Sequence, residues 1–320
     1  MKADPARSLV SVALLLQAAF AALAGCSRHS QSPSTTPPTA APPAAASAPA
    51  AAIADGAPRI ALAPDGVHID YRVYGHGRPL VVLIHGWSCD ANYWRAQIED
   101  LKSTYTVVAV NLAGHGGSGR NRENWTIPAF GVDVAAVLTA LPEGKVVLVG
   151  HSMGGQVALE AARSIPDRLL GIVGVDTFHG LGEAPKPDPA MDALIAGMRA
   201  DFIGATREFV TTMLFRKGAD PTLVRRVADD MALAPPQVAI PSLVALSRYD
   251  TRPALAQIHV PIVDIRSDMW PDDSAQVRRA VPAFRVDVMP GRGHFPMMED
   301  PAGFNVLLRR EIAALARAPG

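Results

Sequence analysis

Short apolar runs alternate with amphipathic stretches along most of the chain beyond about residue 66. Runs such as Leu-Val-Val-Leu-Ile at residues 80–84 are apolar at every position, as is typical of strands buried on both faces of a parallel sheet. Seven strands are predicted, at residues 67–74, 80–85, 106–111, 145–150, 170–176, 261–266 and 284–289. Strands that alternate with helices predict an α/β fold, with a mostly parallel central sheet covered by helices on both faces.

Helical periodicity appears in three segments between these strands, at residues 128–141, 153–165 and 301–316. The last of them has a clear start, because Asp300 is a good N-cap and Pro301 suits the first helical position. Residues 181–254 break the alternation with helix-like pieces at 192–215 and 221–232, so we predict a helical cap inserted into the sheet topology. Residues 59–320 are then one domain.

The first 58 residues have a different character. Positive charges precede an apolar run at residues 9–24, so residues 1–25 are predicted to be a signal peptide. The ending Leu-Ala-Gly-Cys resembles the bacterial lipoprotein signal, which implies cleavage before Cys26 and lipidation of that cysteine; an ordinary signal peptide with a chance cysteine is the alternative. Ser27, where that pattern uses aspartate for inner-membrane retention, implies an outer-membrane lipoprotein of the cell envelope. Residues 26–58, rich in Ala, Pro, Ser and Thr, are predicted to be a disordered tether.

Composition excludes several classes of protein. The 30 basic and 30 acidic side chains give a formal net charge of +0, so we expect no nucleic-acid partner. The two cysteines, Cys26 and Cys89, cannot form a disulfide framework, and neither has the neighbours of a zinc site. With no metal-ligand cluster or phosphate loop in the sequence, we expect no metal and no cofactor.

The most informative motif is Gly-His-Ser-Met-Gly at residues 150–154, between an apolar strand and an Ala-rich helix. This is the context of a nucleophile elbow, in which flanking glycines let the backbone turn sharply and lift the serine hydroxyl clear of the sheet. Ser152 is therefore the predicted nucleophile. The free N–H of Met153, at the start of the helix, is predicted to bind a developing oxyanion.

Two further segments fit an acyl-transfer site. His-Gly-Trp at residues 85–87 follows the strand at 80–84, and a backbone N–H beyond this sharp turn could join that of Met153 in binding an oxyanion. His294 lies between glycine and phenylalanine after the last strand, where a general base would reach the serine. His85 and His151, close to the same site, are interpreted as structural.

These pieces together resemble the α/β-hydrolase superfamily, and the resemblance covers the chain from about Gly66 onward. The matching motifs are His-Gly-Trp at 85–87, the loop at 111–118, the elbow at Ser152, and Gly-His-Phe at 293–295 leading to Glu-Asp-Pro at 299–301. The resemblance implies a serine esterase-like branch with a helical cap, in which Ser152 is the nucleophile and His294 the general base. It also implies that the N–H groups of Trp87 and Met153 form the oxyanion hole. Asn111, where the family commonly has aspartate, departs from the pattern outside the triad.

The function implied is hydrolysis of carboxylic esters of small to medium substrates through an acyl-enzyme. Ser152 argues against the epoxide-hydrolase and haloalkane-dehalogenase branches, because both need an aspartate nucleophile there. Peracid-forming or halogenating (haloperoxidase-like), lactonase, amidase and C–C bond hydrolase activities share the motifs and remain open. The second class of hypothesis is a non-catalytic envelope binding protein. A dinucleotide site at residues 114–119 is disfavoured, because no helix follows the glycines directly.

The acid of the triad is the residue that the sequence specifies least. In the family it usually follows the penultimate strand, and the common spacing would place it at Trp270, so the role must shift. Asp268, closest to the end of the strand at 261–266, is the preferred candidate. Asp176, at the end of the strand after the elbow, is the alternative. Asp272 and Asp273 are further candidates that would otherwise cap a helix at 274–280.

Overall fold

A computed structural model of the chain describes residues 55–317. The predicted signal peptide, Cys26 and most of the predicted tether lie outside these residues. Pro58, expected to end the tether, begins the first strand of the structure. Within residues 55–317 no helix is both long enough and apolar enough to cross a membrane.

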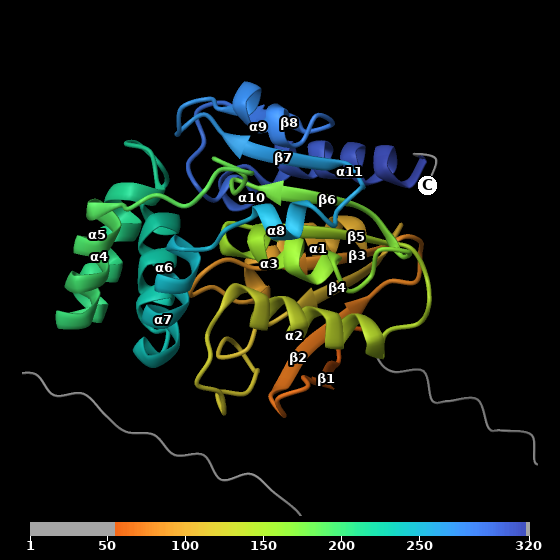
Figure 1. The fold of residues 1–320 in the computed structure, drawn as a ribbon, viewed down its shortest axis with the longest axis horizontal. Helices are drawn as coiled ribbons and strands as arrows, with labels where there is room; N and C mark the ends of the chain where they lie inside the picture. Colours follow the sequence, from red (N-terminus) through yellow and green to blue (C-terminus); the bar gives the residue numbers. More distant parts are fainter. Residues whose placement is uncertain (1–54, 318–320) are drawn as a thin grey trace, which may run out of the picture. The chain divides into compact units, whose positions relative to one another are not determined.

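Eight strands form one twisted sheet in the order β1-β2-β4-β3-β5-β6-β7-β8 (Figure 1). Strands β1 and β2 are antiparallel to their neighbours, and the other pairings from β4 to β8 are parallel. The strands are β1 Pro58–Leu62, β2 His68–Tyr74, β3 Leu80–Ile84, β4 Thr106–Val110, β5 Val146–His151, β6 Leu169–Val175, β7 Ile262–Ser267 and β8 Arg285–Met289. This is the α/β-hydrolase arrangement, and the predicted fold class is confirmed.

Strand β1 was not predicted from the sequence. It lies at the edge of the sheet and pairs only with β2, and Ala61 is its one fully buried residue. An edge strand that buries so little carries almost no hydrophobic alternation. The other seven strands begin and end within two residues of the predicted positions.

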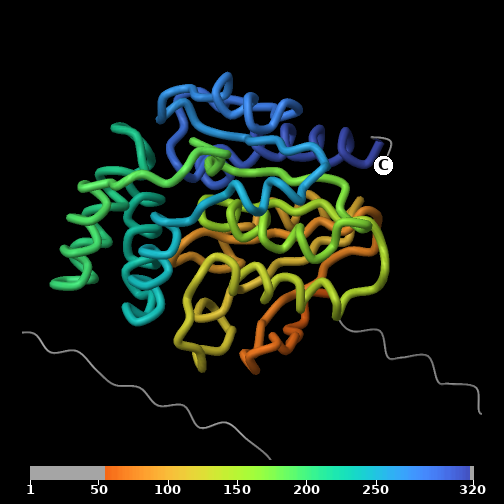
Figure 2. Tube along the Cα trace, in the orientation of Figure 1, coloured from red at the N-terminus to blue at the C-terminus, as the bar shows by residue number. Residues whose placement is uncertain are grey.

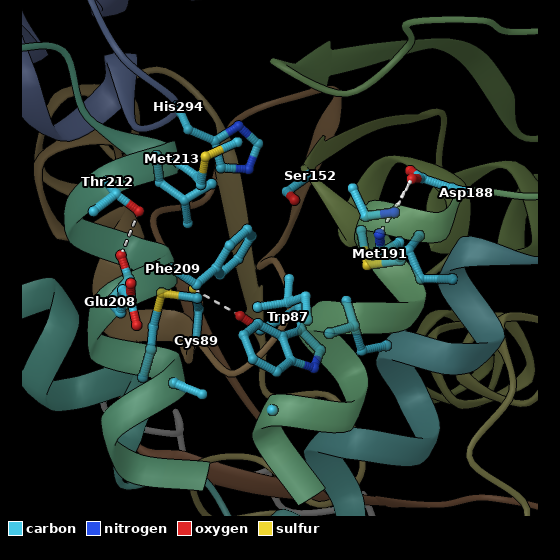
Figure 3. Close-up of a pocket in the computed structure, with 18 of the residues that line it drawn as sticks. Trp87, Cys89, Ser152, Asp188, Met191, Glu208, Phe209, Thr212, Met213 and His294 are labelled. Atoms are coloured by element: carbon cyan, nitrogen blue, oxygen red, sulfur yellow. Dashed lines mark hydrogen bonds between the residues drawn. The ribbon is translucent and has the colours of Figure 1, made fainter. Parts of the chain in front are cut away.

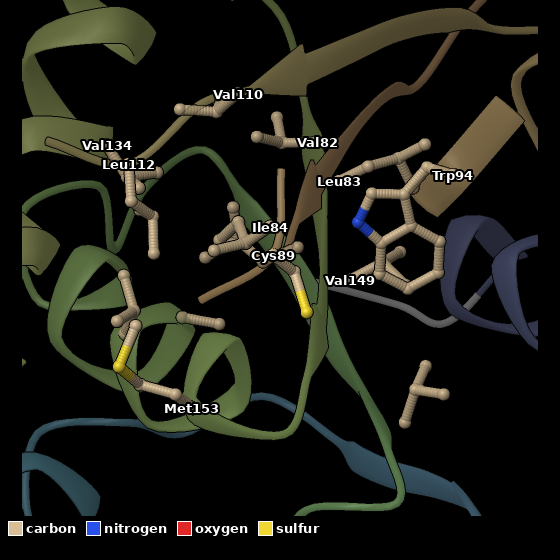
Figure 4. Packing of buried hydrophobic residues seen from close by; sticks show 14 of the residues in the cluster. Val82, Leu83, Ile84, Cys89, Trp94, Val110, Leu112, Val134, Val149 and Met153 are labelled. Carbon is tan, nitrogen blue, oxygen red and sulfur yellow. The ribbon is translucent and has the colours of Figure 1, made fainter. Parts of the chain in front are cut away.

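Helices cover both faces of the sheet. On one face α2 (Ile127–Ala140) packs against α3 (Met153–Ala162), and on the other α1 (Arg95–Leu101) packs against α11 (Pro301–Arg317). Between these layers the central strands are buried at every position, with Val82, Leu83, Ile84 and Val149 among the side chains of the core (Figure 4). Because the core sits at β3 and β5, the loops at the carboxyl ends of these strands have a rigid base.

Five α-helices lie between β6 and β7, and the first four of them are called here the cap helices: α4 Pro189–Ala200, α5 Phe202–Phe209, α6 Pro221–Ala232 and α7 Pro236–Ser247. The fifth is the short α8, Arg252–Leu255, which leads back to the sheet. They stand beyond the arrowheads of β6 and β7, and the chain leaves the sheet and returns to it there (Figures 1 and 2). The single helical piece expected at 192–215 is broken at Asp201. This residue leaves the helical conformation and caps α5 by accepting from the amide of Gly204.

Helix α7 was not predicted from the sequence. It begins after Pro235 and contains Pro241 within its length. Proline favours the first turn of a helix but disfavours the interior, so the helical pieces predicted for the cap did not include this segment. Pro241 is the sixth of the twelve residues of α7. It lies past the first turn, so the helix forms although the carbonyl of Gln237 loses its intrahelical donor.

Candidate active site

Ser152 occupies the turn between β5 and α3 with φ of 51° and ψ of −125°. A positive φ is rare for a residue other than glycine and persists where the surrounding structure imposes it. Here the turn is held because the amide of Ser152 donates to the Val175 carbonyl (3.0 Å) and the Thr177 hydroxyl donates to the Ser152 carbonyl (2.6 Å). The strained geometry expected of a nucleophile elbow is present.

The flanking glycines are required by close contacts. A Cβ atom on Gly150 would lie 2.2 Å from the carbonyl oxygen of Gly154, and one on Gly154 would lie 2.4 Å from that of Ile84. Backbone atoms of a central strand cannot move away from such a clash. The Gly-x-Ser-x-Gly spacing therefore lets the start of α3 pack directly against β3.

His294 lies in the loop after β8, and three hydrogen bonds hold it. Its amide donates to the carbonyl of Leu214 (2.8 Å), at the end of the π-helical segment Val210–Leu214 that follows α5. Its carbonyl accepts from Nε2 of His151 (2.8 Å), and Nδ1 of its ring donates to Oδ2 of Asp176 (2.6 Å). With Nδ1 protonated, the neutral imidazole has its free lone pair on Nε2, the nitrogen that a serine hydroxyl would need.

The structure corrects the preferred partner of His294. The carboxylate of Asp268 is half-exposed and accepts from Nη2 of Arg216 (2.7 Å) and from the amide of Gly291 (2.8 Å), so it does not contact the imidazole. Asp176, the alternative, holds that position from the end of β6. Asp272 and Asp273 are also elsewhere, because both bind the guanidinium of Arg266.

Asp176 is fully buried, and its carboxylate accepts every hydrogen bond that it makes. Oδ1 accepts from the amide and the hydroxyl of Ser267 (2.9 Å each), and Oδ2 accepts from Trp270 Nε1 (3.3 Å) as well as from His294. Burial raises the pKa of the Asp176 carboxyl, but the hydrogen bond and charge of His294 and the Ser267 donors outweigh burial and leave that pKa well below its usual value. Trp270, at the family's common acid position, thus supports the relocated carboxylate.

The predicted oxyanion hole consists of two backbone amides, those of Met153 and Trp87. Met153 begins α3, and amides in the first turn of a helix have no partner within it. Trp87 follows β3, and within residues 55–317 its amide has no acceptor. Its indole Nε1 donates to the carbonyl of Ala239 in α7 (2.7 Å), which ties the loop to the cap helices. Asn111, the departure from the family pattern, also supports this loop, because its side chain accepts from the amide of Ala91 (2.8 Å).

His85 and His151 have structural contacts, as interpreted from the sequence. Both ring nitrogens of His85 are used: Nδ1 donates to the Gly86 carbonyl and Nε2 accepts from the amide of Leu112. Burial, and then the neighbouring His294, lower the pKa of His151 to about 3, so its ring is neutral at physiological pH. Its one bond, to the His294 carbonyl, orients the loop that carries His294.

Glu299 was not singled out as a site residue, yet it supports the histidine loop from the other side. Its carboxylate accepts from the amide of Gly293 (2.9 and 3.0 Å) and from that of Phe295 (3.4 Å), the two residues that flank His294. The signal in the sequence was its place in the Glu-Asp-Pro segment quoted for the family resemblance. A carboxylate five residues after the histidine can bind back onto the loop that carries it.

Two cavities meet at Ser152 and His294. The first, called here the apolar cavity, has a volume of about 690 Å³ and lies between the elbow and the cap helices, with Trp87 and Phe209 on its walls (Figure 3). The second, called here the polar cavity, has a volume of about 600 Å³ and is lined by Gln156, Thr177 and His179. Leu246 and Trp270 border both. A substrate whose scissile bond lies at Ser152 would therefore have one part in the apolar cavity and the other part in the polar cavity.

The segment at residues 114–119 forms turns between β4 and α2, and α2 begins only at Ile127. The arrangement therefore lacks the strand-to-helix turn that cradles a pyrophosphate. In the described part of the chain, no cluster of three His, Cys, Asp or Glu side chains could hold a metal ion.

A buried carboxyl near the site predicts a pH dependence of stability. Asp264 on β7 is fully buried; Oδ2 accepts from the Phe178 amide (3.3 Å), and Oδ1 has no partner within residues 55–317. Burial, reinforced by the charge of Asp176, raises the pKa of Asp264 to about 7. Since the unfolded carboxyl titrates near about 4, the folded state holds the extra proton between these values and loses stability as pH rises through this window.

We expect Asp264→Asn, which carries no ionisable group, to melt at a higher temperature relative to the native chain at pH 8 than at pH 5. Thermal unfolding followed by circular dichroism at both pH values measures this difference. A difference in Tm that does not change with pH would contradict the assignment of a neutral Asp264.

Comparison with known proteins identifies a matching family and several relatives. The model of the alpha/beta hydrolase family matches residues 81–306. A pimeloyl-[acyl-carrier protein] methyl ester esterase of Neisseria meningitidis is 27% identical over 239 residues, covering 72% of this chain and 91% of that protein. The acetyltransferase component of an acetoin cleaving system (dihydrolipoyllysine-residue acetyltransferase) of Cupriavidus necator is 30% identical over 266 residues, 78% of this chain and 67% of that protein.

Among solved structures, a thermophilic esterase from Thermogutta terrifontis superposes with a TM-score of 0.71 at 24% identity, covering 81% of this chain and 99% of that one. At this identity the likeness concerns the fold alone. The domain of this chain therefore has the fold of that esterase over nearly the whole length of the esterase.

Proposed function

The chain belongs to the alpha/beta hydrolase family, and on this premise we propose that it is a serine hydrolase that cleaves carboxylic esters of small to medium size through an acyl-enzyme. The observation that carries the proposal is the bond between Asp176 and His294 beside a serine on a strained elbow, with serine and histidine lining the same cavities. An esterase of Neisseria meningitidis among the relatives adds support.

In the proposed reaction Ser152 Oγ attacks the ester carbonyl while Nε2 of His294 accepts its proton. The amides of Trp87 and Met153 donate to the oxyanion. The protonated imidazole, stabilised by Asp176, returns the proton to the departing alcohol. Water, deprotonated by the same histidine, then releases the acid. Catalytic hydrogen bonds are often long before substrate binds, and within residues 55–317 no hydrogen bond joins the Ser152 hydroxyl to the imidazole.

A series of p-nitrophenyl esters from acetate to palmitate tests the proposal. We expect kcat/KM to be highest for acyl chains between butyrate and octanoate, because a cavity of about 690 Å³ closed by cap helices accommodates a short apolar group. No interfacial activation is expected above the solubility limit of the ester. An optimum at palmitate would reject the size class, and the absence of turnover on every ester would reject the esterase.

The proposal includes anchoring of the chain to the bacterial cell envelope. It is supported by the Leu-Ala-Gly-Cys sequence that ends at Cys26. Stable anchoring takes more than one acyl chain, which the lipoprotein pattern supplies. In detergent phase partition we expect the native chain in the detergent phase and Cys26→Ser in the aqueous phase. Equal recovery of both from the aqueous phase would refute the anchor.

A further inference from the structure

We infer that this site selects against negatively charged substrates, so that neither the acyl nor the alcohol group of the ester carries an anionic group. The inference rests on the proposed function and names its substrate class. It is carried by the charges that line the two cavities at Ser152. Neither cavity is lined by a lysine or an arginine, and both are lined by carboxylates.

In the apolar cavity the two charged groups are Asp188 and Glu208. Figure 3 shows Asp188 to the right of Ser152 and Glu208 at the lower left, on the other side of the serine. Asp188 caps α4 by accepting from the amides of Ala190 (3.0 Å) and Met191 (3.1 Å). No lysine or arginine of the described chain lies within ion-pair distance of either carboxylate. Both residues are exposed to solvent, so each adds a partly screened negative charge to the lining of the cavity without a compensating cation.

The polar cavity offers no cation either. Of its two carboxylates, Asp176 is bound to His294, which lines the same cavity, and Asp273 is bound to Nη1 of Arg266 (2.8 Å), which does not line it. That guanidinium is buried and also binds Asp272, so its charge is already matched. Burial, and then Arg266, lower the pKa of His179, which leaves the one further titratable side chain of this wall neutral.

The carboxylates of the two cavities affect neutral and negatively charged esters differently. For a neutral ester, moving the aliphatic chain from water into the apolar cavity is favourable in free energy. A substrate carboxylate loses its hydration and gains no partner, while it approaches two fixed carboxylates. Like charges placed close together are a strong means of rejecting a ligand. The acid produced by hydrolysis is itself an anion, so the same field favours its release.

The test compares esters that differ in charge and little in shape. Monomethyl adipate ends in a carboxylate, and dimethyl adipate replaces that carboxylate by a neutral methyl ester. At pH 7.5 and low salt we expect kcat/KM per ester bond to be at least ~10-fold lower for the monoester. The difference should shrink at high ionic strength, because salt screens partly exposed charges.

Substitution of Asp188 and Glu208 tests whether these carboxylates cause the difference in kcat/KM between the two esters. We expect Asp188→Asn and Glu208→Gln each to raise the monoester to diester ratio of kcat/KM by ~3-fold, and the double variant by ~10-fold. Asparagine is also a good N-cap, so Asp188→Asn keeps the start of α4. Asp192→Asn is the matched control, since Asp192 is an exposed carboxylate of the same helix that does not line the cavity.

The outcomes are separable. Equal kcat/KM for the two esters, or a ratio that the double variant leaves unchanged, overturns the inference and leaves the proposed esterase standing. A ratio that Asp192→Asn raises as much as Asp188→Asn also overturns it, because the effect would then come from net charge. Failure to hydrolyse either ester overturns the proposed function and the inference with it.

Discussion

Asp176→Asn is expected to lower kcat by about 10⁴-fold, the scale known for loss of a triad aspartate. Oδ1 of the asparagine would remain on the Ser267 donors, which turns its NH₂ group toward His294. Nδ1 of the histidine must then accept rather than donate, so the proton moves to Nε2, the nitrogen that has to accept from Ser152. Steady-state hydrolysis of p-nitrophenyl butyrate measures the loss.

The substitution leaves the backbone of the site intact. Asp176 has φ of 48°, and asparagine adopts this conformation more readily than other residues with a side chain. The matched control is Asp268→Asn, which removes a half-exposed ion pair to Arg216. Such exposed pairs contribute at most about 1 kcal/mol to the free energy of folding. Since Asp268 does not contact His294, kcat should change by less than ~2-fold. Crippled Asp268→Asn beside active Asp176→Asn, both folded by circular dichroism, would return the acid role to Asp268.

Ser152→Ala is expected to lower kcat by about 10⁶-fold, as loss of a nucleophile does when the remaining groups act as one unit. His294→Ala should cost about as much, and the double variant should be no slower than either single variant, because each change already abolishes acylation. A fluorophosphonate probe should label the native chain and leave Ser152→Ala unlabelled, as intact-protein mass spectrometry would show.

The control for this loss is Ser88→Ala, since Ser88 is a second serine with positive φ (54°) in a loop after a strand. It separates removal of a nucleophile from the effect of alanine at a strained position. We expect Ser88→Ala to be labelled and to turn over substrate. Labelling of Ser152→Ala at the native stoichiometry, or strictly additive losses in the double variant, would place the nucleophile elsewhere.

The elbow and the sheet could be predicted because their signals are local. Ser152 lies in a five-residue motif whose glycines are needed because the turn leaves no room for a side chain. Strand β3 and residues 146–149 of β5 are apolar at every position because they are buried on both faces of the sheet. His294 was found from its place after the last strand. Asp201 and Pro241, in contrast, shaped the cap helices through capping and position within a helix, which periodicity alone does not report.

The choice between Asp176 and Asp268 was not local. Both follow a strand of a parallel sheet, and both strand ends lie at the same edge. At the end of β7 the side chain and amide of Ser267 bind Asp176, and since consecutive side chains of a strand point to opposite sides, the next residue, Asp268, points away. There it meets Arg216, which follows the cap helices α4 and α5 in the chain.

By itself the sequence determined the fold class, and it singled out Ser152, His294 and the amides of Trp87 and Met153 as candidates for the site, because each signal depends on a turn or a strand of a few residues. Only the tertiary structure decided which carboxylate orients the histidine, that Glu299 supports its loop, and that both cavities lack a cation. Those features depend on which side chains from distant segments face the same space, and that is settled only when the sheet and the cap helices pack together.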